Sequence, residues 1–390
     1  MDVAQFENSP IGTLEPISGV DALRRSYDHY AFVPHPLPDE IQLSGRTLNT
    51  VVDAGIALGR LDGEGHRLPT PSHLARPAIR AEAVSTSALE GTYTTLPRVM
   101  QSELMGEETS SEDREVLDYV RAAELGFALV EDGKPVSLNM IKRLHKALMQ
   151  RDPHCPPNEK GEIRTRQNFI GPTNAEIANS HFVPPPAGPI LERGLNHLET
   201  WMHRQGEIPL LVRVAVGHYQ FETLHPFVDG NGRIGRLIAI LLLLDEGALS
   251  VPILNISPYL QARREEYQDL LRRVSATGDF DTWVAFFCEG IRAQSLAGLE
   301  KTHRLLQLRD VMVEKLRSRN VRGMAIKVAE DLIGRPVLTT TEVRDLYGVK
   351  YQSASNIIQT LVSAGLLEDI PWRKNRRLFF SQEIIDIYEG

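Results

Sequence analysis

A glycine-rich bend that runs directly into eight consecutive apolar residues is the feature that most constrains how this chain folds. The bend is HPFVDGNGRIGR at residues 225–236, and the apolar run is LIAILLLL at residues 237–244. An apolar run of this kind predicts a buried helix whose N-terminal end faces the bend. The glycines on either side of Asn231 leave backbone N–H groups able to converge on an anion. We therefore predict a phosphate cradle that opens a buried helix.

The side chains of the bend predict chemistry on a phosphate. Arg233 and Arg236 are three residues apart, so they share a helix face and suit two successive phosphates of one nucleotide. Asp229 would repel those phosphates unless a cation lay between them, and one carboxylate with phosphate oxygens and waters is a usual Mg²⁺ site. His225 titrates near neutral pH and precedes the cradle by one turn, where it can take a proton from an attacking hydroxyl. These roles describe nucleotidyl or phosphoryl transfer to a hydroxyl.

Two simpler interpretations of the bend are weaker. His225 and Asp229 are spaced as metal ligands on a helix, but Pro226 and the glycines oppose a regular helix there, and the arginines would repel a bare metal ion. A plain turn would not need all twelve residues of the pattern. The chain has no Gly-x-x-x-x-Gly-Lys-Ser/Thr run, so it is not a P-loop protein of that type.

The bend resembles the signature of Fic-domain proteins, His-x-Phe-x-Asp/Glu-Gly-Asn-Gly-Arg-x-x-Arg, at every defined position. The resemblance implies transfer of AMP from ATP to a Ser, Thr or Tyr hydroxyl of a target protein or of the enzyme itself. It implies that His225 is the general base, that Asp229 is the Mg²⁺ ligand and that Arg236 holds the γ-phosphate. The nucleotide-binding residues that it implies in the bend are Gly230, Asn231, Gly232, Arg233, Ile234, Gly235 and Arg236.

A second motif lies on a helix predicted near residues 77–90 and stopped by Gly91. Residues 85–91, STSALEG, resemble the Ser/Thr-x-x-x-Glu-Gly/Asn inhibitory motif of regulated Fic proteins. Alone, Thr86 and Glu90 would be a surface pair, but the preceding residues 80–83 also resemble the Fic amino-terminal region. The resemblance implies that Glu90 pairs with Arg236 and occupies the guanidinium that the γ-phosphate needs, by about 1.5–3 kcal/mol. The resting enzyme is then an inhibited one.

The bulk composition is that of a cytoplasmic globular protein. The 390 residues are 42% hydrophobic and 24% charged, with two cysteines and a net charge of −8. The first residues lack a basic segment followed by an apolar one, so we expect no secretory signal, and the apolar run at 237–244 is too short to cross a bilayer. The charge argues against general attraction to nucleic acid, although a local basic patch remains compatible with it.

Helical spacing of apolar residues dominates the chain, so the predicted fold class is mainly α. We expect three parts: residues 1–107 with the inhibitory helix, 108–292 as the Fic core, and 293–390 with a linker helix at 303–319 and a small domain. In the core, residues 168–171 and 181–186 are predicted to be short extended pieces around a polar loop, which resembles the flap hairpin of the family. A flap would align a target segment by backbone pairing, whereas the alternative is a plain connector.

Two further predictions concern nucleotide and partner selection. Many Fic proteins have a Tyr-Tyr pair where this chain has Glu266 and Tyr267, so Tyr267 is either an adenine-stacking residue or a core aromatic. Near the C-terminus, two helices at 340–347 and 351–364 precede extended pieces around a basic tip at 372–377, which resembles a winged helix-turn-helix domain. Such a domain binds DNA, contacts proteins or forms a homodimer, and the sequence leaves these alternatives open.

Overall fold

The computed structural model describes residues 1–21, 23–65, 72–106, 110–172, 175–204, 206, 208–373 and 376–389. The chain divides into two compact units: the first contains residues 1–58, 121–249 and 256–293, and the second contains residues 59–120, 250–255 and 294–390. Three of their five boundaries fall inside α1 (Gly45–Gly65), α4 (Ser111–Glu131) and α11 (Phe280–Ser318), and the other two flank residues 250–255, whereas the three parts expected from the sequence are contiguous. The described chain is mainly helical, as predicted, and carries small antiparallel sheets.

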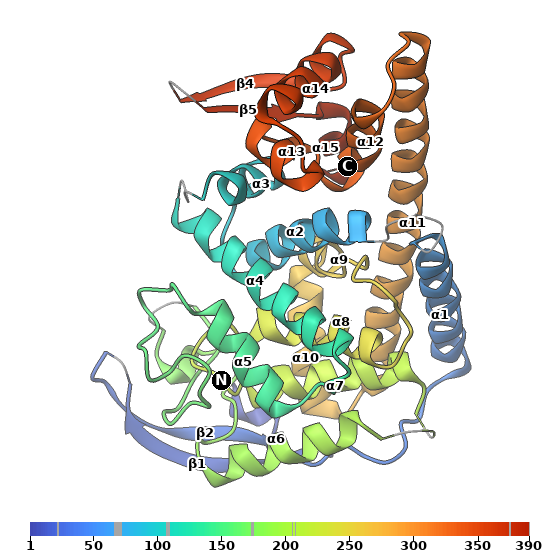
Figure 1. Cartoon of the computed structure of the whole chain (residues 1–390). Helices are drawn as coiled ribbons and strands as arrows, with labels where there is room; N and C mark the ends of the chain where they lie inside the picture. Colours follow the sequence, from blue (N-terminus) through green and yellow to red (C-terminus); the bar gives the residue numbers. More distant parts are fainter. Residues whose placement is uncertain are drawn as a thin grey trace. The chain divides into compact units, whose positions relative to one another are not determined.

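Buried helices form the centre of the first unit. Its helices besides parts of α1, α4 and α11 are α5 (Leu138–Leu148), α6 (Pro189–Met202), α7 (Leu210–Leu224), α8 (Asn231–Asp245), α9 (Ser257–Ala262) and α10 (Arg264–Thr277). α7 and α8 pack against each other, with α6 and α10 on α7 and α5 on α8 (Figure 1). α8 is buried along nearly its whole length because residues 237–244 are apolar on every face. The buried helix predicted after the bend is confirmed.

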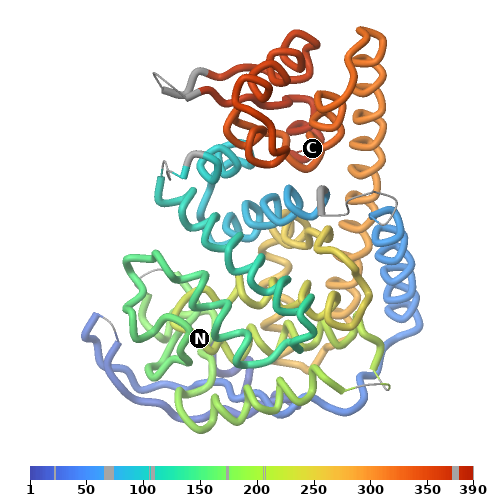
Figure 2. The backbone as a smooth tube through the Cα atoms, in the orientation of Figure 1, coloured from blue at the N-terminus to red at the C-terminus, as the bar shows by residue number. Residues whose placement is uncertain are grey.

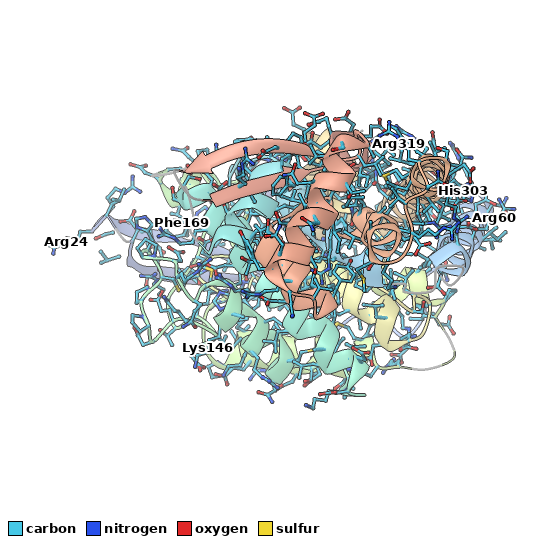
Figure 3. All side chains as sticks on the ribbon, turned by 45° about the horizontal axis from the view of Figure 1, so that its top comes forward. Arg24, Arg60, Lys146, Phe169, His303 and Arg319 are labelled. Atoms are coloured by element: carbon cyan, nitrogen blue, oxygen red, sulfur yellow. The ribbon has the colours of Figure 1, made fainter. Side chains whose placement is uncertain are left out.

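An antiparallel hairpin that the sequence analysis did not predict begins the first unit. β1 (Gly12–Val20) pairs with β2 (Ser26–Pro34), and Figure 3 shows Arg24 projecting from the turn between them. Pro16 and Gly19 within β1 hide its strand pattern, because both residues are poor strand formers.

The predicted flap lies beside this hairpin, as Figures 1 and 2 show. Phe32 on β2 donates its N–H to the carbonyl of Val183 at 2.9 Å, and both residues belong to one apolar cluster with Phe6 and Phe182. The described flap residues form one antiparallel bridge, between Ile170 and Phe182, instead of a hairpin of two regular strands. The two extended pieces are thus paired as predicted, but over a shorter length.

The second unit contains the helix predicted to carry the inhibitory motif together with the C-terminal elements. Besides parts of α1, α4 and α11, the α-helices and strands of this unit are α2 (Ser72–Leu89), α3 (Leu96–Met105), α12 (Met324–Asp331), β3 (Val337–Leu338), α13 (Thr340–Tyr347), α14 (Tyr351–Ser363), β4 (Glu368–Arg373), β5 (Arg376–Phe380) and α15 (Gln382–Glu389). α2 packs against α3 and α15, and α3 packs against β3 and α15. The helix predicted near 77–90 is therefore α2.

A buried arginine fastens α2 to α3. Arg80 is 2% exposed, and it donates from Nε to Glu103 Oε2 at 2.8 Å and from Nη2 to Glu103 Oε1 at 2.5 Å. Its Nη1 donates to the carbonyl of Arg76 at 2.8 Å. This bidentate pair is the strongest type of side-chain link between two helices.

The C-terminal elements agree with the predicted helices and extended pieces. The strands lie in the order β3-β5-β4, and α13 starts in a capping box, in which Thr339 Oγ1 accepts from the N–H of Glu342 at 3.1 Å. α13 ends at Gly348, which has a φ of 62°. In the predicted basic tip at 372–377, Lys374 and Asn375 lie outside the described residues.

The longest helix departs from the sequence prediction. α11 runs without a break over 39 residues, so the linker helix expected at 303–319 is the C-terminal part of a longer helix, on which His303 lies and which ends just before Arg319 (Figure 3). α1 is likewise continuous from Gly45 to Gly65. Among the described residues, no helix combines the length and apolar character that a membrane crossing requires.

Candidate active site

The predicted cradle lies between the end of α7 and the start of α8. His225 ends α7 and Gly230 precedes α8, and both have left-handed backbone conformations, with φ values of 47° and 76°. Gly230 is well suited to this position, because a side chain there would be strained. The first N–H groups of α8 have no acceptor one turn earlier in the helix, so they face the mouth of the bend. The local geometry is that of an anion-binding helix N-terminus.

The Asn231 side chain locks the bend from inside. Asn231 is 2% exposed, and its Oδ1 accepts from the N–H of Phe227 at 2.8 Å, while its Nδ2 donates to the carbonyl of the same residue at 2.8 Å. Both backbone polar groups of a fully buried residue are thereby satisfied. The carboxamide thus shapes the cradle, and the part of Asn231 placed to meet an anion is its backbone N–H.

His145 on α5 supports the bend, and the sequence analysis did not identify it. Its ring stacks on Phe227 with centroids 3.8 Å apart, its Nδ1 accepts from the N–H of Gly161 at 2.9 Å, and its Nε2 lies 3.1 Å from the carbonyl of Asp229. Since Nδ1 accepts, the proton is on Nε2, which donates to that carbonyl. Burial lowers the pKa of His145 to about 4, so the ring is neutral at neutral pH.

This buried histidine predicts acid sensitivity. The folded state holds His145 neutral down to about pH 4, whereas the unfolded chain binds a proton below about pH 6.5, so the free energy of unfolding falls as pH drops through this window. The shift corresponds to about 3 kcal/mol. Urea unfolding at a series of pH values should show a shallower fall for His145→Gln than for the wild type. His218, whose pKa burial lowers to about 3, acts in the same direction in both proteins.

The matched control for this experiment is His197→Gln, at an exposed position on α6. This variant should keep the pH dependence of the wild type. An equally steep fall for His145→Gln would contradict the assignment of the acid sensitivity to His145.

Arg164, four residues before the flap, and Asn168, its first residue, also hold the bend. Arg164 is 3% exposed, and its Nε donates to the carbonyl of His225 at 2.8 Å while its own N–H donates to the carbonyl of Pro226 at 2.9 Å. Asn168 Nδ2 donates to the carbonyl of Phe227 at 2.8 Å. The flap is therefore attached to the residues that carry the base. No sequence signal marked these contacts, because they join residues about sixty positions apart.

The imidazole of His225 is oriented by its own helix. Its Nδ1 lies 3.3 Å from the carbonyl of Glu222, which can only accept, so Nδ1 is the donor. The neutral ring then carries its lone pair on Nε2. A left-handed conformation costs a residue other than glycine roughly 1–2 kcal/mol. Here the N–H of His225 still bonds to Phe221 at 3.0 Å, and Arg164 holds its carbonyl, so the surroundings impose this conformation.

Asp229 presents its carboxylate at the surface of the cradle. The side chain is 68% exposed, and its Oδ1 accepts from the N–H of Gly230 at 2.5 Å and lies 3.7 Å from Arg233 Nη2. Among the described residues, no group of three or more His, Cys, Asp or Glu side chains is placed to hold a metal ion. A metal at Asp229 would therefore take its other ligands from a nucleotide and from water, which fits the way proteins hold Mg²⁺.

The remaining predicted residues of the bend differ in what their side chains do. Arg233 and Arg236 are 5% and 2% exposed. Gly232 lies between Asn231, the first residue of α8, and Arg233. Ile234 is fully buried in the core, and a Cβ on Gly235 would lie 2.3 Å from Glu222 Oε1, so this glycine permits the close approach of α7 and α8. The Ile234 side chain therefore packs in the core, and the absence of a side chain at Gly235 makes room for Glu222.

Tyr267 lies in the core, as expected if it is a core aromatic. It is 5% exposed, its hydroxyl lies 2.8 Å from His218 Nε2, and its ring is 6.0 Å from that of Trp283. Contact of Tyr267 with adenine stays a prediction. Glu90 lies directly after α2 in the second unit and is exposed, whereas Thr86 is fully buried. The pairing of Glu90 with Arg236 stays a prediction.

Two segments of the chain match a known protein family. Residues 48–128 match the Fic/DOC family N-terminal region, and residues 135–243 match the Fic/DOC family. The chain is 31% identical over 181 residues to the protein adenylyltransferase Fic of Aedes aegypti, and 28% identical over 178 residues to the protein adenylyltransferase fic-1 of Caenorhabditis elegans. These matches cover 46% and 45% of the chain but 32% and 31% of those proteins, so the chain spans about a third of the length of these curated relatives.

Solved structures share the fold. The crystal structure of a Fic family protein from Desulfovibrio desulfuricans has a TM-score of 0.55 at 21% identity, over 89% of this chain and 99% of that chain. The structure of Fic-1 from C. elegans has a TM-score of 0.50 at 20% identity, over 67% of this chain and 75% of that chain. At these identities the likeness shows the fold alone.

Proposed function

Because the chain carries the Fic/DOC N-terminal region and the Fic/DOC domain, we propose that it is an autoinhibited protein adenylyltransferase. It transfers AMP from ATP to a Ser, Thr or Tyr hydroxyl of a target protein, itself included. The observation that carries this proposal is the placement of His225, whose Nδ1 is bonded to Glu222 at the mouth of a helix N-terminus. The names of the relatives from A. aegypti and C. elegans support the reaction class.

The reaction follows from this geometry. The target hydroxyl attacks the α-phosphorus of ATP, its proton passes to His225 Nε2, and the bond from the α-phosphorus to the oxygen bridging to the β-phosphorus breaks. Pyrophosphate leaves, and AMP remains on the target. The N–H groups at the start of α8 and the guanidinium of Arg233 receive the phosphate charge. A positioned base contributes about 10²- to 10⁴-fold to such a step.

Asp229 is the residue that would hold Mg²⁺. Its exposed carboxylate lies at the start of α8, beside the place where we put the phosphates. The ion would supply positive charge that offsets the repulsion between this carboxylate and the nucleotide.

Glu90 is the residue that would keep the enzyme inactive. Its carboxylate competes with the γ-phosphate for Arg236, so ATP binds unproductively or not at all. A charge-assisted pair of about 1.5–3 kcal/mol corresponds to a repression of about 10- to 150-fold. The same carboxylate would position water if the enzyme removed AMP instead of adding it.

The test is the Glu90→Gly variant of the full chain. With Mg²⁺, ATP labelled at the α-phosphate and a cell lysate, we expect at least tenfold more labelled protein than with the wild type, because Arg236 is released. Glu131→Gly is the matched control, since Glu131 is also an exposed glutamate at the end of a helix. Labelling by Glu90→Gly that does not exceed the wild type would contradict the inhibitory role.

Two alternatives have distinct signatures in related assays. If the enzyme removes AMP, the wild type releases AMP from a modified target and Glu90→Gly loses that release. If the chain is instead a nucleotide-sensing transcriptional regulator, no nucleotide labels any protein, and retention of a specific DNA survives His225→Ala.

A further inference from the structure

The C-terminal part of the second unit has the order of elements of a DNA-reading domain. α12, β3, α13, α14 and the antiparallel pair β4–β5 follow one another, with β5 between β3 and β4 in the sheet. Gly348 ends α13 in a left-handed conformation, and only residues 348–350 separate α13 from α14, which pack against each other. In a helix-turn-helix of this kind, the second helix is the one that enters the major groove. That helix is α14.

The exposed side of α14 carries hydrogen-bonding side chains and no charge. Its buried side is formed by Ala354, Ile358 and Leu361. The opposite side presents Gln352, Asn356, Gln359 and Ser363, which are all exposed and follow helical spacing. We call these four residues the uncharged stripe. Gln352 Nε2 donates to Asn356 Oδ1 at 3.1 Å, so the first two amides are already oriented.

The composition of the stripe distinguishes a DNA surface from the alternatives. Residues 351–363 contain no Asp or Glu, although the chain has 51 acidic residues, so no carboxylate on this helix would repel phosphates. The stripe itself contains no aliphatic or aromatic side chain, which a protein interface would need at its centre. The large exposed hydrophobic residue of α14, Tyr351 at 58% exposure, lies at the N-terminal end of the helix and outside the stripe. Asn and Gln match the donor and acceptor pattern that adenine shows in the major groove.

Cations lie at both ends of the stripe. Lys350 is exposed at the N-cap of α14, where the helix dipole adds partial positive charge. At the other end, Arg319 Nη1 donates to the carbonyl of Ser363 at 2.8 Å, and Lys315 Nζ is 3.7 Å from the position of a Cβ on Gly365. α14 has 13 residues, so these charges are about 20 Å apart. An uncharged reading surface between two groups of phosphate-binding cations fits a duplex.

We propose that α14 reads duplex DNA in the major groove, with Gln352 and Asn356 contacting bases and with Lys350 and Arg319 contacting phosphates. This binding function is separate from adenylyl transfer. It needs neither ATP nor His225, so each proposal stands or fails by its own readout.

The test uses the full chain and a pool of random-sequence DNA duplexes at physiological salt. Repeated selection should enrich one sequence that the protein retains. Gln352→Ala combined with Asn356→Ala should weaken binding of that sequence at least tenfold but leave binding to the starting pool unchanged, because each lost base contact costs about 1–3 kcal/mol. Lys350→Ala combined with Arg319→Ala should weaken binding of the selected sequence and of the starting pool alike, and should reduce the salt dependence of binding.

The matched control is Gln382→Ala on α15. Gln382 is an exposed glutamine that also donates to a side chain four residues later, Asp386 Oδ1. It should bind the selected duplex as the wild type does. No enriched sequence, or equal retention of that sequence by the variant lacking Gln352 and Asn356, would overturn the proposal. A change of oligomeric state in the α14 variants without any DNA retention by the wild type would show that α14 contacts protein.

Discussion

In a Glu90→Gly background, His225→Ala is expected to reduce AMP incorporation by at least a hundredfold, to the level of a sample without enzyme. The reason is that the imidazole is the group placed to take the hydroxyl proton, with Nδ1 bonded to Glu222 and Nε2 carrying the lone pair. Incorporation is measured with ATP labelled at the α-phosphate. ATP binding, measured by calorimetry, should stay within a fewfold of the parent, because alanine leaves the N–H groups of α8 in place.

The matched control is His197→Ala in the same background. His197 is exposed on α6, so its removal should change neither labelling nor thermal stability. Labelling that persists in the variant lacking His225 would show that another group accepts the proton, and the proposed mechanism would be wrong.

Arg164→Met is expected to lower both stability and activity. The guanidinium donates to the carbonyls of His225 at 2.8 Å, Pro185 at 2.5 Å and Arg166 at 3.1 Å. Methionine fills most of the volume but donates nothing, and each buried carbonyl left without a partner costs about 1–3 kcal/mol. We expect the free energy of unfolding, measured in urea, to fall by about 3 kcal/mol. The rate of AMP transfer should fall as well, because the carbonyl of His225 loses the hydrogen bond from Arg164 that holds the backbone of the base.

Arg166→Met is the control for this variant. Arg166 is two residues along the chain and 55% exposed, and it pairs with Glu159 at 3.1 Å. An exposed ion pair is worth about 0–1 kcal/mol, so stability should change little. If Arg164→Met matched Arg166→Met in both stability and rate, Arg164 would not be holding the base.

The bend could be predicted from the sequence because its information is local. The glycines, the carboxylate, the base and the following apolar helix are contiguous, and the left-handed residue Gly230 and the buried α8 follow directly from residue type. The order of α13, α14, β4 and β5 was also predictable, since capping residues and Gly348 mark the ends of short elements.

The supporting residues could not be predicted, because their roles depend on distant partners. His145 and Arg164 bond to backbone groups 84 and 61 residues away, and a carbonyl has no signature in the sequence. Tyr267 was ambiguous for a related reason, since whether an aromatic residue faces a ligand or the core depends on what covers it. Here His218 and Trp283 enclose it.

The Arg80–Glu103 pair sets how α2 can move. Arg80 is buried and Glu103 is 27% exposed, so separating them would cost up to the roughly 3–5 kcal/mol of a fully buried pair, against about 1.5–3 kcal/mol for a pairing of Glu90 with Arg236. Moving α2 alone would therefore break the Arg80–Glu103 pair in addition to the proposed pairing of Glu90 with Arg236. If Glu90 holds Arg236 as proposed, a signal that releases Glu90 without breaking the Arg80–Glu103 pair would have to move α2 and α3 together, along with β3 and α15, which pack against them.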